Sequence, residues 1–377
     1  MTVLVLGRFP PPIDGHTIAT QRLSDLLAPS CEVHRVDLSA KEVGLTQARV
    51  RLRPGKVRHY VGLRWRTQVA CQTAPRATVL WTSVSPSPLG HLRDVLTVLP
   101  AFRPEQRVYA VVHWGNFERL FTSFSTRWTA RRLVERVAGF VFLSEQLSQR
   151  CAPWIPADKR HVIPNTLGAD VLCTPKEVVA KQQRRASRKV LRVLFLSNMI
   201  SEKGYLDVLT AVGIMRQRGL PVEAHFAGGW TSEVDRLAFE RQVAADGLQG
   251  AVTHYGAVRD RARVKRLYLD ADIFVLPTSY PTEAQPLSII EALNAGTPVV
   301  TTAHAGIPEM VRQGQEALFV PPHDPVRIAE AVQELADVRQ WLDFSRGARQ
   351  RFEAAFSPEV VRQRWEALLE KTVSNAG

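Results

Sequence analysis

The chain has 377 residues, 45% of them hydrophobic and 23% charged, which excludes a disordered chain and leaves room for two folded domains. Its net charge is +13, and no apolar run approaches the ~18 residues that a membrane-spanning helix needs. The four cysteines form no CxxC pair, which argues against a zinc site or a redox pair. No secretory segment precedes the first apolar run, so we expect a cytoplasmic protein.

Short apolar runs alternate with helical patterns along the whole chain. In the first half, the predicted strands are residues 3–7, 31–38, 77–83, 107–113, 138–144 and 159–165. In the second half, they are residues 190–198, 222–228, 252–258, 272–278, 297–302 and 317–322. Apolar strands separated by helices favour parallel sheets covered on both faces. The sequence therefore predicts two doubly wound α/β domains, with ligands at the carboxyl ends of the strands in a central cleft that the domains face.

Composition also suggests where the domains end. We predict an N-terminal domain over residues 1–180, a basic linker over 181–192, a C-terminal domain over 193–356 and a final helix over 357–377. The linker prediction rests on six basic residues and no acidic residue in twelve positions. A serine followed by proline, at Ser357 and Pro358, is typical of a helix start. We expect this last helix to pack back toward the N-terminal domain.

Positive charge is concentrated in the first half. Residues 1–175 carry 23 Lys and Arg against 12 Asp and Glu, whereas residues 193–377 carry 19 against 23. Residues 49–66 and 127–136 interleave basic residues with Val, Leu and Trp. This pattern fits a surface that rests on anionic lipid at the inner face of the cytoplasmic membrane, a pyrophosphate-linked acceptor, or a solvated basic surface. No nucleic-acid recognition motif is visible, so we expect no nucleic-acid partner.

The segment EAQPLSIIEALNAGTPVV, which starts at Glu283, places two glutamates around a predicted helix start. Pro286 suits the start of the helix and Gly296 the residue after its end. Glu283 then lies in the entering loop, and Glu291 lies roughly 8–10 Å further along the helix axis. That separation is too large for sharing one proton or one metal ion. It suits contacts with two parts of one elongated ligand.

The first amides of the same helix, those of Leu287 and Ser288, are predicted to receive a phosphate. A lysine at the end of a strand adds to this site. Lys203 stands beside Gly204 in FLSNMISEKGYLDVLTA, where a strand, a loop and a helix follow one another. Such a lysine is well placed for a diphosphate, although a solvated lysine remains the alternative.

The Glu283 segment resembles the retaining GT-B glycosyltransferases, specifically glycosyltransferase family four. Their C-terminal domains carry Glu-x7-Glu followed by Ala, a small residue, Gly and Pro-Val-Val. The resemblance implies that Glu283 approaches the donor sugar and that Glu291 holds the ribose of the nucleotide. This chain has Gln285-Pro286 where many members have Phe-Gly. An ordinary amphipathic helix with two surface glutamates is the alternative.

The resemblance extends to other positions of the second half. The family usually has an Arg in the loop before Lys203, and here Asn198 occupies that region. Gly256 ends a predicted strand near the place where the family recognises the base, and a turn glycine is an equally open interpretation. Ala305 and Gly306 stand where the family usually has a pair of glycines.

In the first half, Gly15 lies between the first strand and a helix start, where its missing side chain leaves room for a ligand. His113 ends the strand VYAVV and matches a family histidine that faces the donor sugar, with a structural histidine as the alternative. His16 and Asn165 are the candidates for the acceptor side. The predicted catalytic residues are thus Glu283, His113 and Lys203.

Together these features predict a metal-independent, retaining glycosyltransferase. It would move a sugar from a UDP- or GDP-sugar to a glycan or lipid-linked acceptor, without a cofactor, in polysaccharide or glycolipid assembly. Asp270 and Asp272 match a metal-binding Asp-x-Asp of another fold, but we interpret them as structural. The chain lacks GxGxxG, which argues against a dinucleotide. The alternatives are an epimerase or phosphorylase of the same architecture, a nucleic-acid-binding protein, and an inactive scaffold at the membrane.

Overall fold

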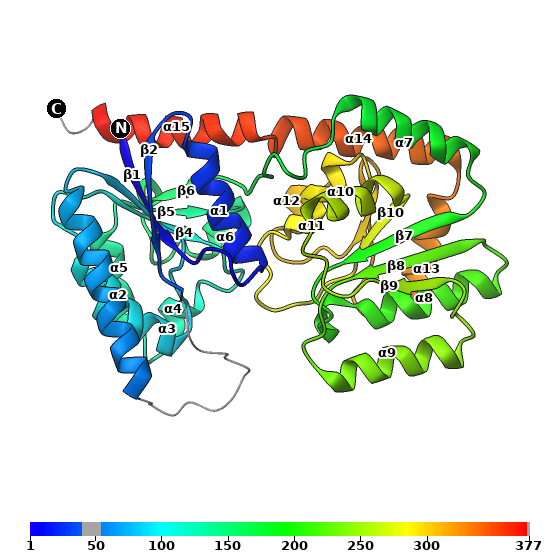
Figure 1. Cartoon of the computed structure of the whole chain (residues 1–377), viewed down its shortest axis with the longest axis horizontal. Helices are drawn as coiled ribbons and strands as arrows, with labels where there is room; N and C mark the ends of the chain where they lie inside the picture. The colour runs from blue at the N-terminus through cyan, green and yellow to red at the C-terminus, as the bar shows by residue number, and fades with distance from the viewer. Residues whose placement is uncertain (40–53, 375–377) are drawn as a thin grey trace. The chain divides into compact units, whose positions relative to one another are not determined.

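A computed structural model describes residues 1–39 and 54–374, and for residues 54–59 and 372–374 it describes the backbone only. The chain divides into two compact units (Figure 1). The first unit is Met1–Asn165 together with Val361–Gly377, and the second unit is Thr166–Val360. Within the described residues, no helix is both long enough and apolar enough to cross a bilayer.

The first unit contains a six-stranded parallel sheet in the order β2-β1-β3-β4-β5-β6. Its strands are β1 Thr2–Gly7, β2 Glu32–Asp37, β3 Thr78–Trp81, β4 Val108–Val112, β5 Gly139–Phe142 and β6 Arg160–Val162. The inner strands β3, β4 and β5 are buried along their whole length. Their continuous apolar runs follow from this position, because helices cover both faces of a parallel sheet.

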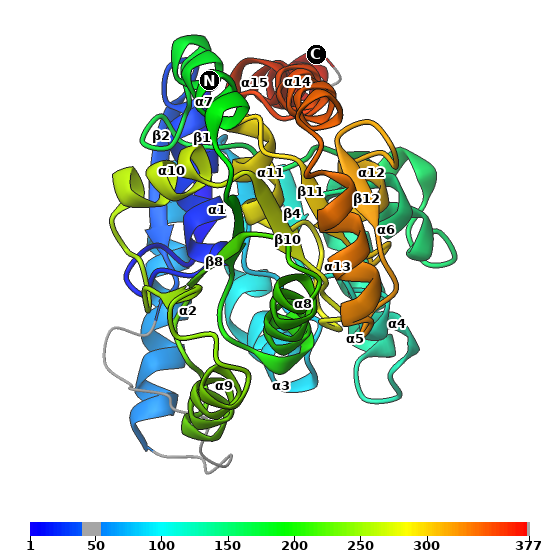
Figure 2. The ribbon, with the colours of Figure 1, turned by 90° about the vertical axis from the view of Figure 1, so that its right-hand side faces the viewer.

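Helices cover the two faces of this sheet unequally. They are α1 Gly15–Leu27, α2 Pro54–Thr73, α3 Pro88–Arg93, α4 Arg119–Thr122, α5 Arg127–Arg136, α6 Glu145–Arg150 and α15 Pro358–Ser374. Short helical turns are η1 Asp94–Val98, η2 Leu99–Ala101 and η3 Ala157–Lys159. In Figures 1 and 2, α2, α3 and α5 lie on one side of the sheet and α15 on the other.

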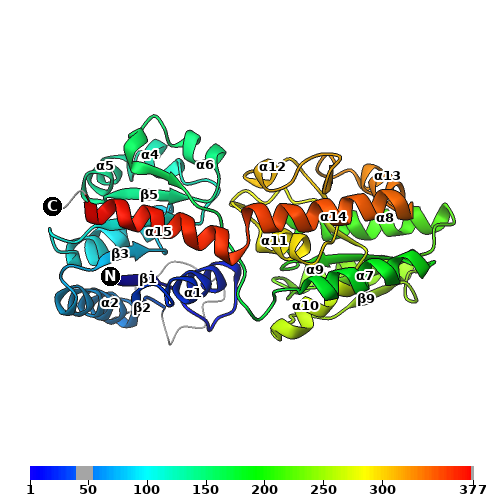
Figure 3. The same cartoon turned by 90° about the horizontal axis from the view of Figure 1, so that it is seen from above.

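The final helix supplies part of the first unit's core. Val361, Trp365 and Leu369 of α15 are buried in one cluster with Val3 and Val5 of β1. Seen from above, α15 lies over the strands of this unit (Figure 3). The helix begins at Pro358, directly after the serine that the sequence marked as a helix start. The last segment of the chain is thus required to complete a domain that begins at residue 1.

The second unit contains another six-stranded parallel sheet, in the order β12-β11-β10-β7-β8-β9. Its strands are β7 Leu191–Leu196, β8 Val222–Ala227, β9 Val252–His254, β10 Ile273–Leu276, β11 Val299–Thr301 and β12 Ala317–Phe319. Its helices are α7 Pro175–Ser187, η4 Ser201–Lys203, α8 Tyr205–Gln217, α9 Glu233–Ala245, α10 Arg261–Asp270, α11 Leu287–Asn294, α12 Ile307–Met310, α13 Pro325–Glu334 and α14 Val338–Ala355.

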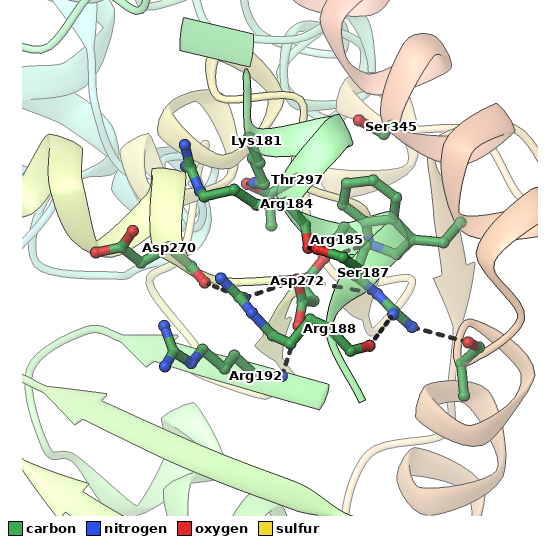
Figure 4. A network of polar contacts seen from close by, with 12 residues as sticks. Lys181, Arg184, Arg185, Ser187, Arg188, Arg192, Asp270, Asp272, Thr297 and Ser345 are labelled. Carbon is green, nitrogen blue, oxygen red and sulfur yellow. Dashed lines mark hydrogen bonds and ion pairs between the residues drawn. The ribbon is translucent and has the colours of Figure 1, made fainter. Parts of the chain in front are cut away.

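The basic segment 181–192, predicted as a linker, lies inside the second unit and not between the two. Its first seven residues form the end of α7, and its last two lie in β7. Lys181 is buried, and its Nζ donates to the backbone oxygens of Tyr268 at 2.9 Å and Ala295 at 3.2 Å. It also donates to the hydroxyl of Thr297, which lies beside it (Figure 4). These carbonyls stand at or near the ends of α10 and α11, where a cation is stabilised by the helix dipole.

Arginines of the same segment 181–192 also have structural roles. Arg185 donates to the backbone oxygen of Ala336 at 2.8 Å, and Arg188 donates to the carboxylate of Asp272 at 3.1 Å (Figure 4). The second carboxylate oxygen of Asp272 accepts the amide of Arg192 at 2.8 Å. Asp272 therefore connects α7 to the start of β10, as the structural interpretation of this aspartate predicted. Composition suggested a linker because it does not show where charged side chains find partners.

Candidate functional site

Lys203 stands at the carboxyl end of β7, in a loop whose shape depends on a glycine. Gly204 has φ +80°, and a Cβ there would lie 2.7 Å from both Cγ and the backbone oxygen of Pro277. Only glycine combines this left-handed backbone with such a close approach. The loop therefore lies directly against the residues that follow β10, and this contact places Lys203 beside the Glu283 segment.

Lys203 and Glu283 form an ion pair, although they are 80 positions apart in the chain. Both side chains are largely buried, with exposed fractions of 11% and 9%. The hydroxyl of Thr278 lies 3.4 Å from the same carboxylate oxygen, and Lys203 Nζ lies 4.7 Å from the centre of the Tyr280 ring. Because a buried charge is costly without a partner, each group stabilises the other.

The loop that contains Glu283 is fixed by two neighbouring segments. The amide of Ser279 donates to the backbone oxygen of Glu202 at 2.7 Å. From the other side, the ring nitrogen Nε2 of His304 lies 2.9 Å from the backbone oxygen of Tyr280, and the amide of Gly306 donates to Ala284 at 3.2 Å. The loop that positions the Glu283 carboxylate is thus held by contacts to its backbone on both sides.

Ala305, between these last two contacts, has φ +49°. The family resemblance pointed to a glycine at this position, and the structure shows the corresponding backbone demand. An alanine in the left-handed region costs roughly 1–2 kcal/mol. The strain is confined to a loop that contacts the Glu283 segment.

The helix α11 begins at Leu287, after Pro286 as the N-cap. Proline has no side-chain group that can accept from the first turn, and no side-chain cap is present. Within the described part of the chain, the amides of Leu287 and Ser288 donate to no partner. The predicted helix end also agrees, because Gly296 has φ +59° and follows the C-cap residue. The start of α11 offers two amides and the positive end of a helix dipole to an anion.

Glu291, one turn further along α11, is buried and paired with Arg261. The guanidinium of Arg261 also lies 3.5 Å from the carboxylate of Asp170. Burial alone lowers the pKa of Arg261, but the carboxylates of Glu291 and Asp170 together hold it above its ordinary value. The sequence reasoning did not single out Arg261. Its only signal was a position at the start of the basic helix RARVKR, directly after the N-cap Asp260.

Gly256 follows β9 and has φ +66°, with no atom within 4 Å of the position of a Cβ. Its backbone oxygen accepts the amide of Gly228 at 2.9 Å, and a Cβ on Gly228 would lie 1.8 Å from the backbone oxygen of Ser197. The left-handed backbone thus accounts for Gly256, and open space remains beside it. Both interpretations of this glycine, turn and base site, stay open.

In the first unit, Gly15 is the first residue of α1, and the carboxylate of Asp14 caps the helix by accepting the amide of Thr17 at 2.8 Å. No atom lies within 4 Å of a Cβ on Gly15, so packing does not require glycine here. Arg8 pairs with Asp14 at 3.1 Å. The predicted open approach to this helix start is present in the first unit.

His16 and His113 come together at the ends of α1 and β4, with their ring centres 5.0 Å apart. His16 Nε2 lies 2.7 Å from the backbone oxygen of Thr82, whereas the buried Nε2 of His113 has no hydrogen-bond partner in the described residues. Burial lowers the pKa of His16, and burial together with His16 lowers the pKa of His113 well below its ordinary value. Both rings are therefore neutral near pH 7, and the sequence did not predict that they meet.

The remaining predicted residue, Asn165, is half-buried at the end of the first unit's main segment. The structure thus groups the predicted residues of each unit: Lys203 with Glu283 in the second, and His16 with His113 in the first. Glu291 is partnered separately, by Arg261. Among the residues that the structure describes, no group of three or more His, Cys, Asp or Glu side chains is arranged to hold a metal ion.

Residues 191–337 match the family model described as "Glycosyl transferases group 1". The putative colanic acid biosynthesis glycosyltransferase WcaL of Escherichia coli is 25% identical over 194 residues, which are 49% of this chain and 46% of that protein. The amylovoran biosynthesis glycosyltransferase AmsK of Erwinia amylovora is 26% identical over 196 residues, 50% of this chain and 46% of that protein. The chain spans about half the length of these curated relatives.

Solved structures resemble the chain over its whole length. HepE of Anabaena in complex with UDP aligns with a TM-score of 0.73 at 15% identity, over 98% of this chain and 100% of that one. Sucrose-phosphate synthase of Thermosynechococcus elongatus aligns with a TM-score of 0.76 at 17% identity, over 100% of both chains. The predicted fold, two Rossmann-like domains of the GT-B type, is confirmed. The match of residues 191–337 to the group 1 glycosyltransferase model agrees with the predicted resemblance of the second half.

Proposed function

We propose that this chain, whose residues 191–337 form a group 1 glycosyltransferase domain, transfers a sugar from a nucleotide-diphosphate donor to a glycan or lipid-linked acceptor. The donor would be a UDP- or GDP-sugar, and the reaction would retain the anomeric configuration without a metal ion. Relatives named for colanic acid and amylovoran biosynthesis support a role in polysaccharide assembly. We place this role at the cytoplasmic face of the membrane.

One observation carries the proposal: the start of α11 combines a lysine and two buried glutamates with two amides that have no partner in the described part of the chain. The amides belong to Leu287 and Ser288, and Lys203 lies beside Glu283 in the loop that leads to them. An anion is favoured here by the helix dipole and by the ammonium group together. Glu291, deeper in the same helix, offers a carboxylate suited to hydroxyl groups such as those of a ribose.

The Lys203–Glu283 pair suggests how the donor would be bound. A diphosphate carries more negative charge than one carboxylate, so it would draw Lys203 Nζ toward itself. Glu283 would then lose its cation and turn to the hydroxyl groups of the donor sugar. The exchange replaces one ion pair by another, so neither side chain is left buried and uncompensated.

The same groups would act on the transition state. The leaving diphosphate gains negative charge as the glycosidic bond breaks, and Lys203 with the amides of Leu287 and Ser288 would stabilise that charge. In such a reaction the leaving phosphate oxygen can accept the proton of the acceptor hydroxyl, so no separate base is required. We assign Gly256 to the neighbourhood of the base and Arg261 to holding Glu291 in position.

In the first unit, we assign His113 to the donor sugar. Its neutral ring and unpartnered nitrogen suit a hydrogen bond with a sugar hydroxyl group. His16, which contacts His113, and Asn165 are assigned to the acceptor, and Gly15 leaves open space at a helix start. These assignments follow the resemblance, with the geometry of His113 as support.

A donor screen by thermal unfolding tests the proposal. We expect one of the UDP-, GDP-, ADP- or dTDP-sugars to raise Tm, because a ligand that binds only the folded state stabilises it by about 2.7 kcal/mol at a hundred times its Kd. The K203M variant should lose most of the shift. If no nucleotide-sugar raises Tm, the proposal fails. If the donor is converted to another nucleotide-sugar without any acceptor, the chain is an epimerase instead.

A further inference from the structure

One face of the first unit is covered by a layer of three neighbouring helical segments: α2, α3 with η1, and α5. The segment α2 contacts η1, and His91 of α3 lies 2.9 Å, through its Nε2, from the hydroxyl of Thr129 in α5. Figures 1 and 2 both show these helices on the side of the sheet away from α15. The three segments are therefore neighbours on one face of this unit.

Large apolar side chains stand exposed on all three segments. They are Val61, Trp65 and Val69 of α2, Leu89, Leu92 and Leu96 of α3 and η1, and Phe124 and Trp128 at the start of α5. Spacings of four residues put Val61, Trp65 and Val69 on one side of α2. Phe124 lies in the turn before α5 and Trp128 in the first turn of α5, with exposed fractions of 79% and 64%. A monomeric protein in water seldom exposes so many large apolar side chains over neighbouring elements.

Arginines are interleaved with these apolar groups. The guanidinium of Arg127 lies 4.8 Å from the centre of the Phe124 ring, and that of Arg131 lies 5.1 Å from the centre of the Trp128 ring. Arg64 and Arg66 are exposed on α2, and Arg132 is exposed on α5. Against these five arginines, the described side chains of α2, α3, η1 and α5 include one exposed acid, Glu135. The other, Asp94, is buried and paired with Arg93.

We propose that this arginine-rich apolar face binds the surface of a bilayer that contains anionic lipids. Side chains of this kind enter the boundary between headgroups and acyl chains, while guanidinium groups pair with lipid phosphates. A second copy of the chain is a poor occupant, because it would place arginine against arginine. A fluid lipid surface accepts protruding rings such as Phe124 and Trp128 without a matching pocket.

The inference deepens the proposed function, on which it rests for its biological sense, since a lipid-linked acceptor would be met at the same surface. It also sharpens the sequence interpretation. The basic segment 127–136 corresponds to α5. Of the basic segment 49–66, residues 54–66 belong to α2, and residues 49–53 lie outside the described part of the chain. The structure adds Leu89, Leu92 and Leu96, which no charge pattern had marked.

Vesicle sedimentation tests the inference with the full chain. The probe is a set of vesicles of phosphatidylcholine, with or without about one-third phosphatidylglycerol. We expect the protein to sediment with the anionic vesicles and to stay in solution with the neutral ones. Failure to sediment with anionic vesicles at low salt would overturn the proposal.

Two double variants separate the apolar and the charged contributions. F124S/W128S should lower partitioning at least tenfold, since both rings leave the bilayer boundary. R127Q/R131Q should lower it about 25- to 30-fold, because each arginine near an anionic surface contributes about fivefold. The matched controls are V234S on α9 and R346Q on α14, which change an exposed valine and an exposed arginine of the second unit. Both controls should partition like the unchanged chain.

Other results would contradict the proposal. Equal partitioning of F124S/W128S and the unchanged chain would rule out this face. Concentration-dependent dimers that F124S/W128S abolishes, in the absence of lipid, would make the face a protein interface. The donor-induced rise in Tm is measured on the same variants, and we expect it to be unchanged. Loss of vesicle binding with retained donor binding therefore separates a failure of this inference from a failure of the proposed function.

Discussion

The two units share one architecture, but the candidate residues of one unit include charged side chains and those of the other include two neutral histidines. Each has a six-stranded parallel sheet, and in each the candidate residues follow strands or begin helices. In the second unit the candidate residues include two buried ion pairs, Lys203 with Glu283 and Arg261 with Glu291. In the first unit the corresponding groups are two histidines in contact, both with lowered pKa values.

This difference follows from the chemistry that each unit offers. The diphosphate site proposed for the second unit would need cations, and buried cations need counter-charges. Neutral imidazoles need no counter-charge, so the first unit can bury them beside a strand end. The outer surfaces differ as well, since the exposed arginines and apolar groups of α2, α3 and α5 belong to the first unit. Shared topology therefore does not imply shared electrostatics.

The largest expected effect tests the paired charges of the second unit. Replacing Glu283 by Gln (E283Q) should leave folding intact and lower turnover about 100-fold, because the carboxylate is assigned to the reacting sugar. The measurement is the rate of sugar transfer at saturating donor. E202Q is a matched control, since Glu202 is exposed in the loop next to Lys203 and supplies only its backbone oxygen there. Wild-type turnover in E283Q would remove Glu283 from the site.

A second prediction concerns Lys181, which has a structural role and whose pKa burial lowers to about 7. K181M should lower the free energy of unfolding of the second unit by about 3 kcal/mol, because the backbone oxygens of Tyr268 and Ala295 lose a buried donor. Thermal or denaturant unfolding measures the change. K176M, at an exposed lysine of the same helix, should have an effect within about 0.5 kcal/mol. An equally small effect of K181M would show that the ammonium is not needed there.

A third prediction concerns His91 of the first unit and the pH dependence of unfolding. Burial lowers the pKa of His91 to about 4. Between pH 6.5 and pH 4 the unfolded chain then binds more protons at this residue than the folded chain, so its contribution to stability is lost as the pH falls. Burial raises the pKa of Asp94 to about 6, which acts in the opposite direction below that pH.

The His91 contribution is therefore measured by difference. H91Q should remove about 2 kcal/mol of the pH dependence of unfolding between pH 6.5 and 4. H34Q, at an exposed histidine of β2, should leave that dependence as it is in the unchanged chain. Parallel curves for H91Q and the unchanged chain would show that the imidazole of His91 is protonated in the folded state as readily as in the unfolded one.

Much of the fold was predictable because it depends on local pattern. Apolar runs such as VYAVV gave strands that the structure places in buried positions, although most predicted bounds extend too far, by up to four residues after β9. Pro286 and Gly296 gave the limits of α11 through their backbone preferences alone. The domain limit at residues 181–192 did not follow in the same way, because a run of arginines is compatible with solvent or with buried carbonyl partners.

What the sequence determined by itself is the set of elements and the residue types at their ends. Strand period, helix caps and left-handed glycines act over a few residues, so the order of residues is enough to predict them. The tertiary structure alone decided that Lys203 meets Glu283, that His16 meets His113, and that Arg261 holds Glu291. These pairs join segments 30 to 97 positions apart, which meet only when parallel strands bring their carboxyl ends to one edge of a sheet.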